Sequence, residues 1–191
     1  MSEAPSPDLD RAARAIEDFL EAIGHPPSSD PELEETGRLV AQAFAEDLLS
    51  GYASRPSEVL AESFPSESPG MVILRDVSTV AICPHHLLPA PGVVHLGYLP
   101  AGRLVGLGAL GRLVQCCARR LALQEQIGQI IAEALCAELG SEFAACVVDL
   151  SPACVTARGG RQQGARAVVQ AFAGSRRADP GLRSEFLASL R

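Results

Sequence analysis

Hydrophobic positions near the start of the chain repeat with the period of an α-helix. Apolar side chains recur every three or four residues over 7–23, and Gly24 followed by a histidine and two prolines ends the pattern. A second helical pattern begins at Pro31, a typical first-turn position, and continues to about Ser50. We therefore predict two N-terminal helices, followed over 51–70 by a Ser-, Pro- and Glu-rich loop that holds about one helical turn.

The pattern then changes to one that favours β-strands. Met71–Ile82 and Val93–Tyr98 are rich in β-branched and other apolar residues, and both are predicted to be strands. Two consecutive helical patterns follow over 108–121 and 123–139. The remaining predicted elements are strands over 143–150, 154–158 and 167–172 and a short helix over 179–191. This order of elements predicts an α+β fold.

The length of 191 residues suits one domain with a sizeable core. Within it we predict a mobile tail over 1–6, a helical segment and loop over 7–69, and a core over 70–191. No apolar run approaches the roughly 18 residues of a membrane span. The first ten residues lack the basic and apolar regions of a secretory signal, so a cytoplasmic location is expected.

Charge is divided unevenly along the chain. Residues 1–80 carry 16 acidic and 5 basic side chains, whereas residues 81–191 carry 7 acidic and 11 basic ones. The basic second half indicates a local anionic ligand, while the net charge of −7 argues against binding to nucleic acid or to an anionic membrane. All 16 basic residues are arginines, which excludes Schiff-base chemistry on lysine and a phosphate-binding P-loop lysine.

A candidate metal-binding segment, Cys83-Pro84-His85-His86, directly follows the first predicted strand of the core. Thiolate and imidazole are ligands that zinc prefers, and the spacing of Cys83 and His86 lets one turn of backbone present both to one ion. Spacing alone does not select a third ligand. Buried thiols need no metal, and that interpretation is preferred for four other cysteines: Cys116, Cys117, Cys136 and Cys146.

An ordered set of motifs resembles the GTP cyclohydrolase I family over residues 8–190. The set comprises ICPHHLLP at 82–89, GVVHLGYLP at 92–100, Gly106-Leu107, RLV at 112–114, RRL at 119–121, Gln124-Glu125, Cys154, Arg158-Gly159 and EFL at 185–187. The resemblance implies the tunnelling fold, in which antiparallel sheets and helix pairs of several subunits associate into a ring. That ring is usually a homodecamer, and the family's active site lies between subunits.

The resemblance also implies a metal centre and a reaction. Zn²⁺ would be held by Cys83, His86 and Cys154, and water on the metal would attack C8 of the guanine ring of GTP. Formate would leave, and 7,8-dihydroneopterin triphosphate would form. His85 matches a family histidine that moves protons during ring opening, a task that suits an imidazole pKa near 6.5.

Four further residues match family positions that contact substrate. Glu125 matches the carboxylate that anchors the two N–H donors of the guanine edge, and Gln124 matches a neighbouring contact. Arg112 and Arg158 match arginines that contact the triphosphate or the rest of the substrate. Without the resemblance, Glu125 would be interpreted as a solvated residue that the helix dipole favours near the start of a helix. Each arginine would be interpreted as a surface ion-pair residue.

Four departures from the family pattern bear on function. Pro152 stands where the family has a catalytic histidine, Gly108-Ala109 replaces a Ser-Lys pair that contacts triphosphate, Leu39 replaces a phosphate-binding arginine, and Pro84 replaces a glutamate. Each lost cationic contact removes about 1.5–3 kcal/mol of charge-assisted hydrogen bonding. The arginines that could replace these contacts are Arg38, Arg103, Arg161 and Arg166.

Three functional hypotheses follow. The leading one is a zinc-dependent GTP cyclohydrolase I, which predicts formate release from GTP. The second is a zinc hydrolase of the same fold acting on a different, less phosphorylated purine, because Glu125 is retained while phosphate contacts are missing. The third is a non-catalytic, ring-forming paralogue that binds a purine or pterin, with Pro152 marking the lost catalysis.

Overall fold

The computed structural model describes residues 6–191, so the tail predicted over 1–6 falls almost wholly outside the described residues. The helices are α1 (Leu9–Ala22), α2 (Thr36–Gln42), α3 (Pro56–Val59), α4 (Leu107–Ala118), α5 (Gln124–Leu139), α6 (Ala153–Thr156) and α7 (Pro180–Ala188). The strands are β1 (Ser63–Pro65), β2 (Val72–Ile82), β3 (Pro89–Tyr98), β4 (Arg103–Val105), β5 (Ala144–Leu150) and β6 (Ala167–Ala173). Four short helical segments complete the set: η1 (Pro27–Ser29), η2 (Pro31–Leu33), η3 (Ala43–Leu48) and η4 (Ser50–Ala53).

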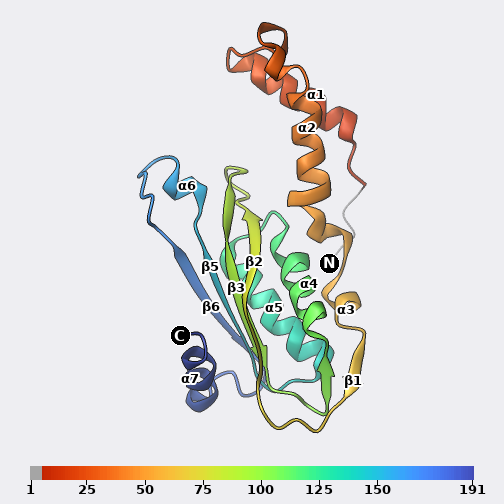
Figure 1. The fold of residues 1–191 in the computed structure, drawn as a ribbon, viewed down its shortest axis with the longest axis vertical. Helices are drawn as coiled ribbons and strands as arrows, with labels where there is room; N and C mark the ends of the chain where they lie inside the picture. The colour runs from red at the N-terminus through yellow and green to blue at the C-terminus, as the bar shows by residue number, and fades with distance from the viewer. Residues whose placement is uncertain (1–5) are drawn as a thin grey trace.

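A four-stranded antiparallel sheet of order β2-β3-β5-β6 forms the centre of the fold, and β1 pairs with β4 in a separate two-stranded sheet. Helices α4 and α5 cover one face of the larger sheet (Figure 1). Successive residues of β5 point to opposite faces: Cys146 and Val148 join the core beneath α4 and α5, whereas Ala145 and Val147 join a smaller cluster around Phe186 of α7. Both faces of β5 are therefore buried. The α+β class predicted from the sequence is confirmed.

Aliphatic side chains fill the main core, as expected for a chain with few aromatic residues. Leu96 of β3, Leu113 of α4 and Ile131 of α5 have no exposed surface. Tyr98 is the one aromatic residue in this cluster, and its hydroxyl accepts a 3.1 Å hydrogen bond from the backbone N–H of Val105. That bond fastens the end of β3 to β4.

The N-terminal helices form a hairpin that extends away from the sheet (Figure 1). Gly37 of α2 lies so close to α1 that a β-carbon at this position would meet the Ala13 carbonyl oxygen at 2.7 Å. The helix predicted from Pro31 to Ser50 is interrupted: η2 precedes α2, the π-helical segment η3 follows it, and η4 continues the chain. No helix among residues 6–191 combines the length and hydropathy that crossing a bilayer requires.

One predicted strand is wrong, and two short strands are missed. Residues 154–158 do not form a strand, because α6 makes a helical turn there, in which the Pro152 carbonyl accepts from the N–H groups of Val155 and Thr156 at 2.9 and 3.0 Å. The β-branched pair Val155-Thr156 favours a strand locally, but one turn after a proline satisfies the backbone instead. β1 and β4 have three residues each, which is too few for a periodic pattern.

Strand β3 begins at Pro89 rather than at Val93, so the predicted strand lacked residues 89–92. Pro89 and Pro91 pair with β2, whereas pairing with β5 starts only at Gly92. A proline lacks an N–H donor, and it is tolerated where one side of the strand has no ladder partner. The extra residues bring β3 directly to the Cys-Pro-His-His segment.

Candidate active site

The candidate metal ligands begin in the loop that joins β2 to β3. The N–H of Cys83 donates to the Leu88 carbonyl at 3.0 Å, and the N–H of Leu87 donates back to the Cys83 carbonyl at 2.9 Å. Leu87 adopts a φ of 54°, which is unusual for a side chain of this kind and closes the loop tightly. The closed loop holds the Cys83 sulfur and the two histidine rings on one short stretch of backbone.

Cys154 reaches the same place from α6, the helical turn that follows β5. The Ser151 N–H donates to the Pro91 carbonyl at 2.8 Å, so the end of β5 remains beside β3 and α6 begins next to the loop. One ligand atom from each of Cys83, His86 and Cys154 lies within 4.8 Å of the other two. The two segments are far apart in sequence, and the β3–β5 pairing brings them together.

The geometry of this group fits a tetrahedral metal ion. Cys83 Sγ lies 3.6 Å from His86 Nδ1. Zinc bound at about 2.3 Å by sulfur and about 2.1 Å by nitrogen places those two atoms about 3.6 Å apart at the tetrahedral angle. Two cysteines and one histidine are a donor set that zinc accepts, and they leave a fourth position for water or substrate.

Electrostatics in the group also favour a cation. Burial, followed by the neighbouring Cys83 sulfur, raises the pKa of the Cys154 thiol. Negative charge on neighbouring sulfurs is mutually repulsive, and a divalent cation between them would offset this repulsion.

Two other predicted site residues lie beside the cluster. His85 Nδ1 is 4.0 Å from Cys83 Sγ, and its exposed ring stands edge-on to the His86 ring, with 6.2 Å between centroids. Arg158 follows α6 and donates from Nη1 to Nε2 of His86 at 2.8 Å. The structure thus brings together Cys83, His85, His86, Cys154 and Arg158, all five of which the sequence analysis named.

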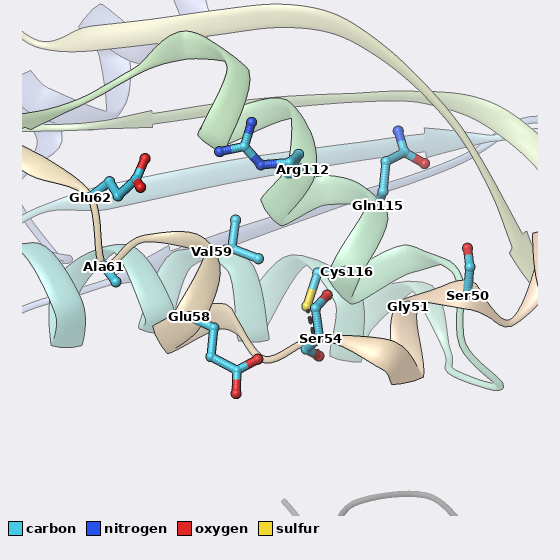
Figure 2. Close-up of a pocket in the computed structure, with 10 residues that line it drawn as sticks. All are labelled: Ser50, Gly51, Ser54, Glu58, Val59, Ala61, Glu62, Arg112, Gln115 and Cys116. Atoms are coloured by element: carbon cyan, nitrogen blue, oxygen red, sulfur yellow. Dashed lines mark hydrogen bonds between the residues drawn. The ribbon is translucent and has the colours of Figure 1, made fainter. Parts of the chain in front are cut away.

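The remaining predicted residues lie on the helix pair. Arg112 of α4 lines a pocket of about 540 Å³, with Glu58 and Glu62 on its opposite wall (Figure 2). Glu125 of α5 lines a different pocket of about 660 Å³. Gln124 is the first residue of α5 and is half-buried. Arg112 and Glu125 therefore line pockets of their own, and neither belongs to the group of candidate metal ligands.

The Glu125 pocket nevertheless lies at the same end of the sheet as Cys83, His86 and Cys154. A β-bridge between Ile82 and Leu121 places the connection of α4 to α5 next to the end of β2. Tyr52 and Arg120 line the Glu125 pocket, and sequence reasoning missed both as candidate site residues. Tyr52 is an isolated tyrosine with no spacing signal, whereas Arg120 belongs to the RRL motif at 119–121, which was used only for the family resemblance.

The positions that depart from the family pattern are unsuited to holding phosphate in this structure. Ala109 is 5% exposed and packs in the main core, while Leu39 is 52% exposed on α2. Pro152 supplies the carbonyl that begins α6 and has no proton to transfer.

Two of the four arginines suggested as replacements already have carboxylate partners. Arg38 pairs with Glu35, and Arg166 Nε donates to Asp149 Oδ1 at 2.7 Å. Arg103, in β4, and Arg161, in the loop after α6, are both exposed. The structure therefore offers Arg103 and Arg161 as the less engaged cations of this set.

Comparison with known proteins identifies the family of this chain. The GTP cyclohydrolase I family model matches residues 12–191. The chain is 38% identical over 180 residues to a GTP cyclohydrolase 1 of Dehalococcoides mccartyi, covering 93% of this chain and 94% of that protein. It is also 38% identical to the GTP cyclohydrolase 1 of Thermobifida fusca, covering 93% and 86%, and 37% identical to that of Rhodopirellula baltica, covering 94% and 78%. The chain belongs to the GTP cyclohydrolase I family.

Proposed function

We propose that the protein is a zinc-dependent hydrolase that opens the imidazole ring of the guanine base of GTP, releasing formate and forming 7,8-dihydroneopterin triphosphate. The observation that carries the proposal is the Cys83, His86 and Cys154 group, whose ligand atoms lie within 4.8 Å of one another in a chain of this family. Zinc in such a three-ligand site acts as a Lewis acid and lowers the pKa of a bound water to near 7.

His85 is proposed to move the proton during ring opening. Its imidazole lies beside the ligand group and is exposed to an incoming substrate. Ring opening needs a group that both accepts and donates a proton near neutral pH, and imidazole is the side chain suited to that role. Since Pro152 cannot transfer a proton, this proposal assigns to His85 and solvent the acid–base work that the family divides between two histidines.

Recognition of the base is proposed for the start of α5. The Glu125 carboxylate can accept both N–H donors on the guanine edge, and Gln124 lies beside it. The positive end of the helix dipole stabilises the carboxylate at this position. Arg158, beside the metal group, and Arg112, in its own pocket, are proposed to contact the phosphates.

These groups would complete one site in an assembly of subunits. In a single chain the metal group, the Glu125 pocket and the Arg112 pocket are separate. β2 and β6 are the edges of the four-stranded sheet, and pairing of one subunit's β6 with the next subunit's β2 would extend the sheet into a ring. We propose a homo-oligomeric ring, with a decamer as the expected size.

A second candidate substrate is a purine with fewer phosphates. Two observations favour it. Ala109 and Leu39 cannot bind phosphate at positions where the family has cationic residues, and Arg38 and Arg166 already pair with carboxylates. Two missing cationic contacts remove about 3–6 kcal/mol from triphosphate binding in total. GDP, GMP and guanosine lose less from this change, because they carry less phosphate charge.

The test is turnover of four purines by one preparation. Zinc-loaded protein is incubated separately with GTP, GDP, GMP and guanosine, and formate and products are followed by mass spectrometry. Cys154→Ala removes one proposed ligand, and Cys136→Ala is the matched control, because Cys136 is a partly exposed free cysteine on α5. Dihydroneopterin triphosphate from GTP, lost in Cys154→Ala and retained in Cys136→Ala, supports the leading proposal.

The other outcomes choose between the alternatives. Formate from GMP or guanosine, with little from GTP, identifies a sister hydrolase with a different substrate. Zinc binding without turnover of any of the four purines contradicts the enzymatic proposals. It would instead indicate a purine- or pterin-binding paralogue.

A further inference from the structure

Strand β2 carries one extra residue where it pairs with the middle of β3. Arg75 and Asp76 of β2 lie opposite the single residue His95. The regular pairs on either side are Leu74 with Leu96 and Val77 with Val94. This arrangement is a β-bulge, which leaves a backbone group of the longer strand without a partner in the ladder. Asp76 has a φ of 57°, and a non-glycine residue in this left-handed conformation persists only when its surroundings support it.

A histidine side chain supplies the partner that the ladder does not. The N–H of Asp76 donates to Nδ1 of His95 at 3.1 Å. Nδ1 therefore carries the lone pair, and the proton of the neutral ring is on Nε2. The His95 side chain is only 12% exposed, which limits the access of water to this bond. The hydrogen bond that supports the bulge thus depends on a neutral His95 ring.

The carboxylate of Asp76 offers the protonated ring a different partner. Asp76 Oδ1 lies 3.9 Å from Nδ1 of His95, and Oδ2 lies 3.9 Å from Nε of Arg75. Once Nδ1 gains a proton it cannot accept from the Asp76 N–H, and it becomes a donor that the carboxylate can accept. One residue therefore presents two partners to His95, and the protonation of the ring decides which of them is bonded.

The strand on the other side of β3 brings a second acidic residue to this face of the sheet. Val147 of β5 pairs with His95, and Asp149 lies two residues further along β5, so its side chain points to the same face. The Asp149 carboxylate is already held by Arg166, whose Nε donates to Oδ1 at 2.7 Å. Asp76 is therefore the acidic partner available to His95.

The other residue of the bulge connects it to the segment after α7. Arg75 donates from Nη1 to the main-chain oxygens of Ser189 and Arg191 at 2.6 and 3.3 Å. The side chain of Arg191 is exposed. Of the charged residues on α7, Arg183 lies over an aromatic ring of β6 and Glu185 is exposed. A change in the backbone of the bulge would therefore reach the segment after α7 through Arg75.

We propose that His95 is a proton-dependent switch for the β2 bulge. The neutral ring accepts from the Asp76 N–H and supports the left-handed backbone there. The protonated ring donates to the Asp76 carboxylate instead, so the Asp76 N–H loses its acceptor, and the bulge and the bonds made by Arg75 loosen. Histidine is the side chain type that ordinarily titrates between about pH 5 and about pH 8. β2 is an edge strand, so its bulge can change while the rest of the sheet stays paired.

The test is amide hydrogen exchange of the full-length, zinc-loaded protein, resolved to the Asp76 amide by mass spectrometry with electron-transfer fragmentation. His95→Asn is the matched variant, because its amide oxygen can accept at the position of Nδ1 and does not titrate. Dividing the wild-type rate by the variant rate at the same pH removes the intrinsic pH dependence of exchange.

We expect this ratio to rise about fivefold between about pH 8 and about pH 5.5, because one hydrogen bond is lost. A ratio that does not change with pH would overturn the proposal. If His95→Asn does not fold, the Gln170 amide of β6 in the same wild-type sample serves as the reference, with the same expected rise.

The same experiment tests the connection to the segment after α7. Exchange of the amides over 187–191 should rise with the same midpoint as that of Asp76. Arg75→Gln should raise exchange over 187–191 at every pH and remove its pH dependence. A response at Asp76 without one over 187–191 would overturn this connection and leave the switch at the bulge in place. Catalytic turnover does not enter either measurement, so failure of the proposed function would not affect the result.

Discussion

Arg158 donates a hydrogen bond to Nε2 of His86, while Nδ1 of the same ring faces Cys83 Sγ. A neutral imidazole has a single lone pair, and Arg158 uses it at Nε2. A metal ion on Nδ1 needs the ring proton on Nε2, where it would face the guanidinium N–H. A metal ion on Nδ1 would therefore exclude the Arg158–His86 hydrogen bond, and its binding would leave Arg158 able to meet an anionic group.

Arg158→Ala is expected to leave zinc affinity unchanged or to tighten it by about fivefold, since an exposed hydrogen bond of this kind is worth about 1 kcal/mol. The same variant is expected to weaken guanine nucleotide binding to the zinc-loaded protein. Competition with a chromophoric chelator measures the first quantity, and calorimetry measures the second. Weaker zinc binding by Arg158→Ala would show that Arg158 supports the metal ligands. It would contradict the claim that metal binding and the Arg158–His86 hydrogen bond exclude each other.

Zinc should stabilise the folded chain, because the proposed ligands join the β2–β3 loop to α6. At a free zinc concentration 100 times the dissociation constant, the free energy of unfolding should rise by about 2.7 kcal/mol. Urea unfolding with zinc and after chelation measures this difference. The increment should vanish in Cys154→Ala and persist in Cys136→Ala; equal increments in both variants would place the stabilising ion elsewhere.

Glu125→Gln should weaken binding of guanine nucleotides by about 10- to 100-fold, since a hydrogen bond to a charged group is worth about 1.5–3 kcal/mol. Inosine nucleotides lack the exocyclic amine and should lose less. Equilibrium binding to the zinc-loaded protein tests both statements. Glu138→Gln is the control, because Glu138 is an exposed carboxylate further along the same helix. Equal losses for guanine and hypoxanthine would remove Glu125 as the base-recognising residue.

Phe186 attaches α7 to the sheet and has no exposed surface, whereas Phe19 of α1 is 58% exposed. Phe186→Ala should lower the free energy of unfolding by about 3–5 kcal/mol, because it removes a buried aromatic side chain and leaves a cavity. Phe19→Ala should change it by less than about 0.5 kcal/mol in the isolated subunit. Urea denaturation compares the two. A large loss for Phe19→Ala would indicate that α1 is covered in the assembly.

Asp179 caps α7 and should make stability depend on acid pH. Hydrogen bonds from Arg176, and then from the Leu182 N–H, hold its pKa below the ordinary 3.8. A carboxylate with a lowered pKa stabilises the folded state above its unfolded value, and this contribution is lost as the pH falls through the folded value. Asp179→Asn should therefore flatten the fall in urea midpoint between about pH 5 and about pH 2. An unchanged slope, equal to that of the exposed-site variant Asp18→Asn, would contradict this.

The longest elements were predictable because their patterns extend over several turns. Helix α1, helix α5 and strand β2 lie where hydrophobic periodicity placed them. Short elements were not predictable in the same way. The Val155-Thr156 pair favours a strand, yet α6 is one helical turn. Asp76, with a φ of 57°, lies in the irregularity that shifts the β2–β3 register, and nothing in the local sequence announces it.

For the candidate site, too, residues close in sequence were predictable and residues brought together only by the fold were not. Cys83 and His86 are three residues apart, and this spacing together with the adjacent histidine pair predicted a metal site. Cys154 joins them only through the pairing of β3 with β5, and no local pattern reports a contact across 70 residues. For that residue the family resemblance was needed. Cys116 was interpreted as a buried thiol, and the structure confirms its burial, whereas no pattern in the sequence indicates that the Arg120 guanidinium is buried and bonded to backbone carbonyls.

The central claim is that two sulfurs and one imidazole nitrogen hold a single zinc ion with an open fourth position. X-ray absorption at the zinc edge tests it most directly, on full-length protein loaded with one equivalent of zinc. We predict two sulfur neighbours at about 2.3 Å and two nitrogen or oxygen neighbours at about 2.0–2.1 Å, one of which belongs to an imidazole. Cys154→Ala should lose one sulfur. A shell of four sulfurs, or one with no sulfur, would contradict the assignment of Cys83, His86 and Cys154 as the metal ligands.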